Sequence, residues 1–510
     1  MAIGCADQRN SLNLYSVAQV RAIEAAAISS AGPGILMRRA GAAVARHALT
    51  LLPEITTDLH VLVAAGPGNN GGDALEAAAL LGQHGIKITI VHLAEENALT
   101  AEARMALKHA RQSGAVFADS IPAMSWSLAI DGLFGIGLTR PLEGRYRDLA
   151  TQLNQLSCPV LAIDVPSGLD ADTGSIVGPN GLAVSANETV TFIANKPGLH
   201  TLYGRDNAGH VVTDDLGIDP SLFPEPIARL NTPLAFADEV RPRVHASHKG
   251  SNGDLQVIGG AEGMSGAVIL AARMALMAGT GRVFAGFAGP VPAYDSLHPE
   301  LMCRHADDLR ADHGAVVIGP GLGMSRHAHD LLGRALSFAP ALVIDADALN
   351  LIAAEPALQS RLAQRTAPSL LTPHPLEAAR LLGTDVHAVQ SDRLSAANAL
   401  AQRYHATVIL KGSGSIIAQP GDIPVINTTG NPALATAGSG DVLAGLCGAL
   451  LAQGWPVKAC ALAATWLHGS AADQMVANGT GPIGATASEL MPWIRNALNK
   501  LVNDYSAIAR

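Results

Sequence analysis

The sequence has few aromatic residues and few cysteines, and both shortages exclude a class of protein. Phe, Tyr and Trp make up 4% of the 510 residues, whereas hydrophobic residues as a whole reach 48%. This composition favours helices packed closely on sheets over sandwiches rich in aromatics. The cysteines contain no CxxC pair, so neither a zinc site nor a disulfide framework is indicated, and a reducing cytosol suits all five: Cys5, Cys158, Cys303, Cys447 and Cys460.

The sequence also lacks a long apolar run, a signal peptide and an excess of positive charge. Its longest clean apolar runs, such as residues 442–452, fall well short of the roughly 20 residues that cross a bilayer. The N-terminus has no apolar core behind a basic start, so it is not a signal peptide. The net charge of −9 argues against nucleic-acid binding driven by bulk charge. We expect a cytoplasmic protein of two or three domains that binds neither membrane nor nucleic acid.

A glycine-rich stretch in the second half leads into a helix and carries one carboxylate. The stretch is NTTGNPALATAGSGDVLAG, Asn427–Gly445, in which glycines give backbone freedom and Asp441 opens an apolar segment. We expect that segment, residues 442–451, to be a buried helix whose first N–H groups and dipole attract an anion. Since Asp441 would compete with a bound phosphate, its expected task is to remove a proton from a reacting hydroxyl. A simple N-cap role for Asp441 stays open.

Strands that end in polar glycine loops organise the first half. Apolar patterns predict helices from Ser16 and over residues 35–52 and 100–113, and strands over residues 60–65, 86–93, 127–131 and 160–164. In a parallel sheet the loops after three of these strands share one edge, where Asn70, Asp131, Asp164 and Ser167 are expected to converge. Oxygen ligands of this kind suit a hard cation, and loop N–H groups suit phosphate. The asparagines of the first loop are also typical of a capped tight turn.

Three motifs of this half resemble the epimerase domain of the NAD(P)H-hydrate repair enzymes: GPGNNGGD, DGLFGIGLTRPLEG and AIDVPSGLDADTG. The resemblance implies a potassium ion among Asn70, Asp131 and Ser167, and a catalytic contact of Asp164 with the substrate. It implies that the hydrated dinucleotide is held by two segments: Asn69, Asn70, Gly71, Gly72 and Asp73, and Gly135, Ile136, Gly137, Leu138, Thr139, Arg140 and Pro141. Ala74 departs from the glycine usual in this family, and its methyl group is expected to crowd the ligand slightly.

A proline-rich join separates the two halves. Prolines at 220, 224, 226, 233 and 242, without sustained periodicity, predict a linker over residues 216–243. We place the boundary after residue 225, which gives domains over 1–225 and 226–510. The second half repeats a strand and a glycine or polar loop five times, with strands predicted over residues 253–260, 315–318, 341–344, 369–371 and 407–410. The fold class is therefore α/β with two doubly wound domains.

The second half is similar over nearly its whole length to the dehydratase domain of the same repair system, a ribokinase-like fold, as the first is Rossmann-like. Six ordered motifs carry the similarity: HKG, GGAEGMSGA, GPGLG, TPHPLE, KGSGS and NPALATAGSGD. They imply contacts with the adenine nucleotide from Lys411, Gly412, Ser413, Gly414, Ser415 and Gly440. They imply contacts with the hydrated nicotinamide from Ala267, Gly323, His374 and Asp441, with Asp441 catalytic.

Some of these residues have simpler interpretations. Taken alone, His374 is typical of a packed or capping histidine, and Lys411 of a solvated charge at a strand end. Leu376 replaces the glycine usual in the TPHPGE motif, and we attach no meaning to it.

Together the two resemblances imply a bifunctional repair enzyme for hydrated NADH and NADPH. Its first domain, with potassium, interconverts the R and S hydrates. Its second domain, with magnesium, dehydrates the S form while ADP or ATP is hydrolysed to AMP or ADP and phosphate. We expect a homo-oligomer. Two alternatives stay open: a ribokinase-like small-molecule kinase, which the fold does not exclude, and an N-terminal module that senses nucleotides without catalysis.

Overall fold

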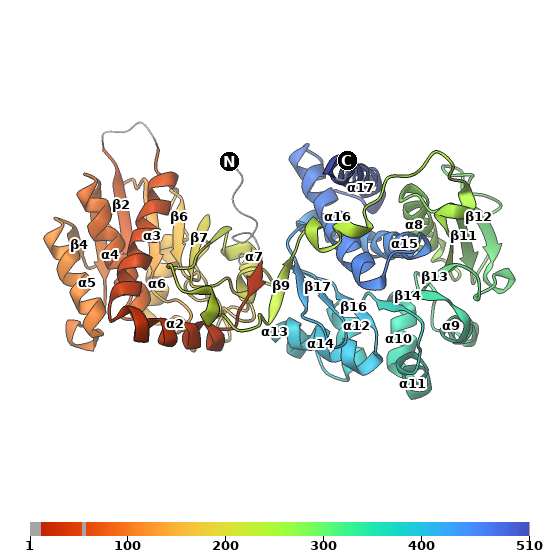
Figure 1. The fold of residues 1–510 in the computed structure, drawn as a ribbon, viewed down its shortest axis with the longest axis horizontal. Helices are drawn as coiled ribbons and strands as arrows, with labels where there is room; N and C mark the ends of the chain where they lie inside the picture. Colours follow the sequence, from red (N-terminus) through yellow and green to blue (C-terminus); the bar gives the residue numbers. More distant parts are fainter. Residues whose placement is uncertain (1–11, 54–57, 509–510) are drawn as a thin grey trace. The chain divides into compact units, whose positions relative to one another are not determined.

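The join between the two halves is structured. The computed structural model describes residues 12–53 and 58–508, and the chain divides into two compact units, residues 1–229 and 230–510 (Figure 1). The segment predicted to be an irregular linker contains strand β9 (Ala228–Asn231), which pairs antiparallel with β1 (Asn13–Leu14). Pro220 and Pro233 begin 3-10 turns there, because the fixed φ of proline suits the first residue of a turn.

The first unit is built on a parallel sheet of seven strands in the order β4-β3-β2-β5-β6-β7-β8. The strands are β2 (His60–Ala65), β3 (Lys87–His92), β4 (Val116–Ala118), β5 (Leu128–Gly132), β6 (Val160–Ile163), β7 (Glu188–Phe192) and β8 (His210–Asp214). The helices are α2 (Val17–Ala31), α3 (Ile35–Leu51), α4 (Asn69–Gln83), α5 (Ala101–Gln112), α6 (Gly144–Leu153) and α7 (Gly204–Asn207). The chain direction across the sheet reverses between β2 and β5, which is where open α/β sheets bind ligands.

The period-two geometry of the strands divides the core of this unit into two layers. Val61 and Val63 of β2 join a cluster with apolar residues of α2 to α5, whereas Leu62 and Ala64 join one with α6. Because successive side chains of a strand point to opposite faces, one apolar run serves both layers.

The second unit has its own sheet, in the order β18-β17-β16-β15-β14-β13-β10-β11-β12. Its strands are β10 (Asp254–Gly259), β11 (Arg282–Phe287), β12 (Met302–His305), β13 (Ala315–Ile318), β14 (Ala341–Ile344), β15 (Ser369–Leu371), β16 (Thr407–Leu410), β17 (Ile416–Ala418) and β18 (Val425–Asn427). Neighbouring strands from β12 across the sheet to β16 pair in parallel. Strand β17 pairs antiparallel with β16 and with β18. The reversal lies between β10 and β13.

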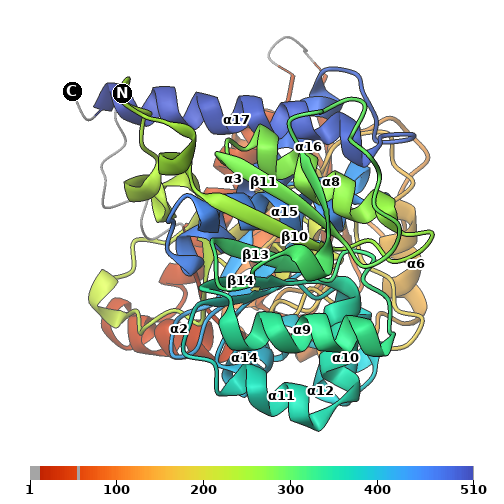
Figure 2. The same cartoon turned by 90° about the vertical axis from the view of Figure 1, so that its right-hand side faces the viewer.

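Helices cover both faces of this second sheet (Figure 2). One layer contains α8 (Ser265–Met277), α15 (Ser439–Ala452), α16 (Val457–Ala477) and α17 (Ala487–Ile508). The other contains α9 (Arg326–Phe338), α10 (Ala346–Ala354), α11 (Pro356–Ala363), α12 (Pro375–Leu382), α13 (Val386–Ser391) and α14 (Arg393–Tyr404). Helix α15 is central, since Val442 to Leu451 are all buried. The predicted α/β class with two doubly wound domains is confirmed.

Two helices begin earlier than the sequence predicts. Helix α15 starts at Ser439, with Gly438 in the left-handed region (φ 87°) as its N-cap, so Asp441 lies in the first turn and is not the cap. Helix α4 starts at Asn69, so NNGGD is a helical turn rather than a loop. In both cases glycine at the cap position lets the helix begin without a side-chain cap.

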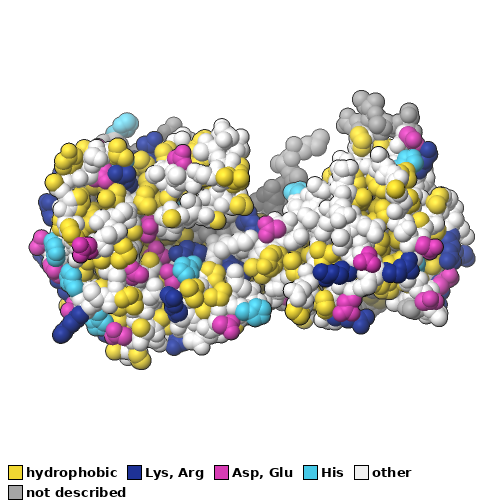
Figure 3. All heavy atoms as spheres, turned by 180° about the vertical axis from the view of Figure 1, so that it is seen from behind, with side chains coloured by type: hydrophobic (Ala, Val, Ile, Leu, Met, Phe, Trp, Pro, Cys, Tyr) yellow, Lys and Arg dark blue, Asp and Glu magenta, His cyan; other side chains and the backbone are white. Residues whose placement is uncertain are grey.

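The outer surface mixes residue types. On the face shown in Figure 3, acidic and basic side chains lie interspersed among apolar ones. Within residues 12–53 and 58–508, no helix is both long and apolar enough to span a membrane.

Candidate functional site

A cavity of about 400 Å³ opens in the first unit at the reversal between β2 and β5. It is lined by residues from the start of α4, from the loop after β5 and from α2, among them Asn69, Asn70, Asp73, Gly135 and Asp164. Asn70 and Asp164 meet at this cavity as predicted, whereas Asp131 and Ser167 are not among the residues that line it. The volume lies in the range of small-ligand sites.

Asp164 is held in this cavity by a buried lysine. Its backbone lies in the left-handed region (φ 65°), which is uncommon for a residue with a side chain. Its Oδ1 is 2.5 Å from Nζ of Lys196, a side chain with no exposed surface, and Nζ also donates to Thr191 Oγ1 at 2.7 Å and the Phe192 carbonyl at 2.9 Å. All three protons of the ammonium group are therefore engaged. The second carboxylate oxygen, Oδ2, accepts the Ile136 N–H of the cavity wall at 3.4 Å.

Asp131 and Ser167 form a second buried group and are not among the residues that line the cavity. The Asp131 carboxylate has no exposed surface and accepts the Ser167 hydroxyl at 2.7 Å, the Ser167 N–H at 2.8 Å and the Leu133 N–H at 3.2 Å. Burial raises its pKa, and these hydrogen bonds oppose that shift. Within the described chain no cation pairs with it, and the buried Asn70 Nδ2 has no hydrogen-bond partner. A buried anion among oxygen atoms, beside an amide with unused capacity, fits a hard cation such as potassium.

The predicted substrate segments only partly face the cavity. Asn69, Asn70 and Asp73 line it, as do Gly135, Ile136, Gly137 and Leu138. Gly71 packs against the Gly66 backbone and Gly72 against Met37, so neither lines it. Thr139 and Arg140 are exposed and Pro141 packs against Gly178, all outside the cavity lining.

Ala74 does not meet the ligand cavity. It is fully buried, and a Cβ placed on Gly132 of β5 would fall 2.5 Å from its methyl group. The expected crowding of the ligand is therefore wrong, because the first turn of α4 directs this side chain onto the sheet.

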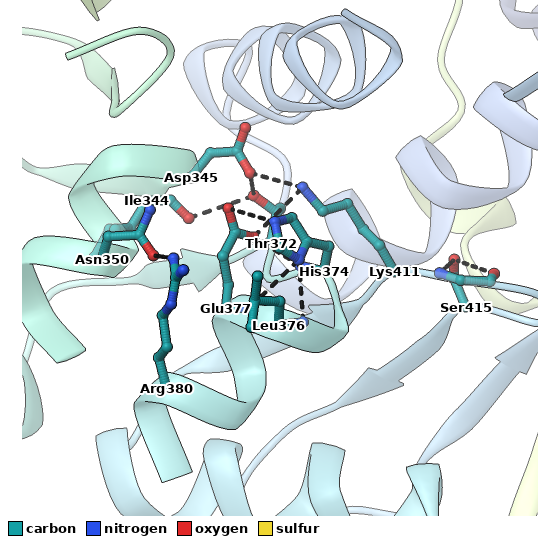
Figure 4. A network of polar contacts seen from close by, with 11 residues as sticks. Ile344, Asp345, Asn350, Thr372, His374, Leu376, Glu377, Arg380, Lys411 and Ser415 are labelled. Atoms are coloured by element: carbon teal, nitrogen blue, oxygen red, sulfur yellow. Dashed lines mark hydrogen bonds and ion pairs between the residues drawn. The ribbon is translucent and has the colours of Figure 1, made fainter. Parts of the chain in front are cut away.

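In the second unit, the strand ends of β14, β15 and β16 meet the start of α15. Lys411 Nζ donates to Asp345 Oδ1 at 3.0 Å and lies 4.0 Å from Glu377 Oε2 (Figure 4). Its side chain is 20% exposed, so the alternative of a solvated strand-end charge is wrong. The two carboxylates raise the pKa of Lys411 although burial alone would lower it.

Asp441 faces this group from the first turn of α15. Burial, with the nearby charge of Asp345, raises its pKa to about 6, while Lys411 opposes the shift. A carboxyl group with a pKa near 6 is ionised at neutral pH yet basic enough to accept a proton, as a general base requires.

His374 and Glu377 form the start of α12. His374 is the N-cap: its Nδ1 accepts the N–H groups of Leu376 and Glu377 at 3.1 and 3.3 Å, and its own N–H donates to Glu377 Oε2 at 2.7 Å. The capping alternative is confirmed for Nδ1. The ring is still 46% exposed, and its other nitrogen, Nε2, lies 3.3 Å from Glu377 Oε1. Burial raises the pKa of Glu377 to about 7.

The glycine turns after β10 and β13 lie against each other. A Cβ on Gly321 would come within 3.4 Å of the Ala267 methyl group, and the Gly323 N–H donates to Asp347 Oδ2 at 2.8 Å. Asp347 in turn raises the pKa of Asp441, so the turn and the base belong to one site. Ala267, Gly323, His374 and Asp441 are thus brought to one edge of the sheet.

The KGSGS loop after β16 is supported from below by a buried arginine. Arg393 Nη2 donates to the carbonyls of Leu410, Lys411 and Gly414 at 3.4, 3.3 and 3.4 Å. A Cβ on Gly412 (φ 143°) would lie 2.6 Å from this guanidinium, and a Cβ on Gly440 would lie 3.3 Å from Lys411 Nζ. Glycine at both positions keeps the loop and the start of α15 close together.

Two family models match separate parts of the chain. A family model described as "YjeF-related protein N-terminus" matches residues 33–198, and one described as "NAD(P)H-hydrate dehydratase" matches residues 255–495. The chain is 37% identical to the "Bifunctional NAD(P)H-hydrate repair enzyme Nnr" of Coxiella burnetii over 95% of its own length and 99% of that protein's.

The chain belongs to the bifunctional NAD(P)H-hydrate repair enzymes.

The family predicted from the sequence is confirmed for both halves, and with it the bifunctional enzyme. The second half is also 44% identical to the "ADP-dependent (S)-NAD(P)H-hydrate dehydratase" of Neisseria meningitidis serogroup B, over 53% of the chain and 94% of that protein. Among solved structures, an ADP/ATP-dependent NAD(P)H-hydrate dehydratase from Bacillus subtilis, co-crystallised with ATP and Mg²⁺, is 27% identical. The match covers 53% of the chain and 97% of that structure, with a TM-score of 0.46.

Sequence reasoning missed several residues of this repair-enzyme fold. Lys196, Asp345, Glu377 and Arg393 all touch predicted site residues. Asp345 directly follows the predicted strand over residues 341–344 and Glu377 stands in the motif TPHPLE, so both positions offered an indication. Lys196 and Arg393 had none, because a lone basic residue is most often exposed.

Proposed function

We propose that residues 1–225 carry the epimerase activity and residues 226–510 the dehydratase activity of this family member, acting on hydrated NADH and NADPH. The observation that carries the proposal is Asp441, a base with a pKa of about 6 in the first turn of a buried helix beside Lys411. The names of the relatives support the substrates and, for the second half, the adenine nucleotide.

In the proposed dehydration, Asp441 removes the proton of the ring hydroxyl while that oxygen takes a phosphoryl group from the nucleotide. The N–H groups at the start of α15 stabilise the charge of the phosphate. Gly440, which has no side chain, leaves space for the ammonium group of Lys411. The KGSGS loop, Lys411 to Ser415, binds the nucleotide, and the hydrogen bonds from Arg393 to its carbonyl groups hold the loop in place. Gly323, Ala267 and the exposed part of the His374 ring hold the nicotinamide. Phosphate then leaves with the C–O bond electrons and a proton leaves the neighbouring ring carbon, and the C–H electron pair restores the double bond.

Magnesium fits this site as an ion bound jointly by protein carboxylates and the phosphates of the nucleotide. The described residues contain no group of three or more His, Cys, Asp or Glu that could hold a metal by themselves. Mg²⁺ is commonly held by one or two carboxylates together with nucleotide phosphates, and Asp347 and Glu377 offer such carboxylates. When bound, it would neutralise charge on the transferred phosphate.

In the proposed epimerisation, Asp164 exchanges a proton with the substrate in the first cavity, which Asn69, Asn70 and Asp73 help to form. Asn70, Asp131 and Ser167 would hold potassium, whose positive charge would complement the buried Asp131. The N–H groups of Gly135 to Leu138 offer donors to the pyrophosphate.

The proposal is tested by incubating the purified chain with racemic hydrated NADH and either ADP or ATP while following NADH absorbance. Full recovery with release of inorganic phosphate is expected. Asp441→Asn should stop recovery and leave epimer exchange intact, whereas Asp164→Asn should stall recovery near half. Accumulation of a stable phosphate ester would instead indicate a kinase, and absence of epimer exchange would indicate a sensing module.

We further propose a cytoplasmic location and a homo-oligomer. The four described cysteines, Cys158, Cys303, Cys447 and Cys460, are free thiols, which a reducing compartment maintains. Light scattering of the purified chain would measure its oligomeric state.

A further inference from the structure

One carboxyl group on α2 faces the first cavity and has no role in the activities above. Glu24 is one of the residues that line this cavity, and it is only partly exposed. Among residues 12–53 and 58–508, its side chain has no hydrogen-bond or ion-pair partner. An ionised carboxylate without a partner in a partly buried wall destabilises the folded protein. This cost is removed if the group binds a proton or contacts a bound ligand.

The surroundings of Glu24 favour its protonated form. Burial is the main cause that raises its pKa, and the charge of Asp164 adds to it. The charged groups that face it from the elements around the cavity are Arg21 on the same helix, Asp73 on α4, Glu102 on α5, Asp164 after β6 and Lys196 after β7. The two cations act against the shift, but the acids and burial prevail.

Asp164 is in the opposite condition. Its Oδ1 is paired with the ammonium group of Lys196 at 2.5 Å. One cavity therefore holds one carboxyl group without a partner and one paired with a buried cation, on two different elements of the fold. Pairs of acids whose environments separate them in this way commonly divide the acid and base roles of an enzyme.

We propose that Glu24 is the general acid and Asp164 the general base of the epimerisation, one on each face of the hydrated ring. This inference rests on the proposed epimerase function. Hydration of the ring places the hydroxyl on the carbon beside the ring nitrogen. Glu24 gives its proton to that hydroxyl, the C–O bond breaks, water leaves, and the nitrogen lone pair forms a planar C=N⁺ bond.

A water molecule then adds to the other face of the planar carbon. As the new C–O bond forms, the C=N⁺ electron pair returns to nitrogen and Asp164 takes the proton of the water. The net change is inversion at one carbon, exchange of its oxygen with solvent, and transfer of one proton from Glu24 to Asp164. Solvent returns that proton, and the reverse epimerisation uses the two groups in exchanged roles.

The test compares the full chain with Glu24→Gln, following epimer exchange without nucleotide. We expect the variant to lose at least about 100-fold in kcat/KM for exchange, while dehydration of the pure S hydrate with ADP is unchanged. Wild-type kcat/KM should fall as pH rises through the raised pKa of Glu24 and the group loses its proton, and the residual activity of Glu24→Gln should lack that fall. A merely structural role would not move the pH profile.

Two further variants sharpen the result. Glu24→Asp keeps the acid and should recover part of the rate, whereas Glu95→Gln, an exposed glutamate of the same unit, should match wild type. If Asp73→Asn rather than Glu24→Gln removes the fall of kcat/KM with rising pH, Asp73 is the acid and our assignment is overturned. Exchange in H₂¹⁸O that inverts the carbon without incorporating ¹⁸O would also overturn it.

Failure of this inference is distinguishable from failure of the proposed function. If wild type exchanges epimers and Glu24→Gln does so equally fast, only the assignment of Glu24 is wrong. If wild type itself does not exchange them, the epimerase function is wrong and Glu24 loses its proposed reaction.

Discussion

Asp441→Asn should abolish dehydration and at the same time stabilise the second unit. Burial and the nearby carboxylates raise the pKa of Asp441 from 3.8 to about 6. Two pKa units correspond to about 3 kcal/mol of preference for the neutral form in the folded protein. A neutral asparagine avoids this cost. It also loses the favourable interaction of a charge with the helix N-terminus, about 0.5 kcal/mol, so a net gain of about 2 kcal/mol is expected.

The pH dependence has a definite sign. A group whose pKa is raised on folding adds stability below its unfolded pKa and loses it as pH rises through the folded value. Wild type should therefore lose the Asp441 contribution between about pH 4 and pH 6, and the asparagine variant should not. Their difference should be largest at pH 7, about half as large at pH 5, and absent below pH 4.

Differential scanning calorimetry of the full chain measures this difference as a change in Tm. The unfolding transition of the second unit is recognised because added ADP raises its Tm. For a unit of this size about 2 kcal/mol corresponds to roughly 4 to 8 °C in Tm at pH 7. Asp330→Asn, at a carboxylate whose side chain is 66% exposed, is the control and should change Tm by less than about 2 °C. An Asp441→Asn variant with unchanged or lower Tm at pH 7, or with a pH-independent gain, would refute the reasoning.

Three other predictions follow from the same contacts. Gly440→Ala places a Cβ 3.3 Å from Lys411 Nζ and should raise the KM for ADP roughly tenfold, with epimer exchange unchanged in the same preparation. Ala74→Gly should lower the free energy of unfolding by about 1 kcal/mol, because Ala74 is buried in helix α4, and should leave the KM for the hydrate unchanged; a lower KM would show that the methyl group does crowd the ligand. Replacing potassium by a large organic cation should slow epimer exchange but not dehydration of the S form, and equal slowing of both would count against the site at Asp131.

The strands that sequence patterns predict correctly share one property. The predicted bounds of β2, β13, β14, β15 and β16 match the structure, because each is an apolar run that ends at glycine or a polar residue. Strands such as β8, β12 and β17 were missed. They are short or lie toward the sheet edges, and in β8 no residue is fully buried, so no sustained apolar run identifies them.

The candidate sites were predictable where the chain places a polar residue directly after a strand. Asp164 and Lys411 directly follow β6 and β16, and Asp131 is the last residue but one of β5. Parallel strands bring such ends to one edge. Their partners could not be found in this way. Lys196 meets Asp164 from 32 positions along the chain, and Arg393, the first residue of α14, meets Lys411 of the KGSGS loop from 18 positions along the chain.

The sequence by itself determined the order of strands and loops, the identity of the acids and bases at their ends, and the family to which the chain belongs. The tertiary structure alone decided how those groups are charged and paired. Asp164 faces a buried lysine, Asp441 faces two other aspartates, and Glu24 faces a cavity without a partner. The reason is physical: the charge of a side chain depends on burial and on neighbours, and both are properties of the folded chain.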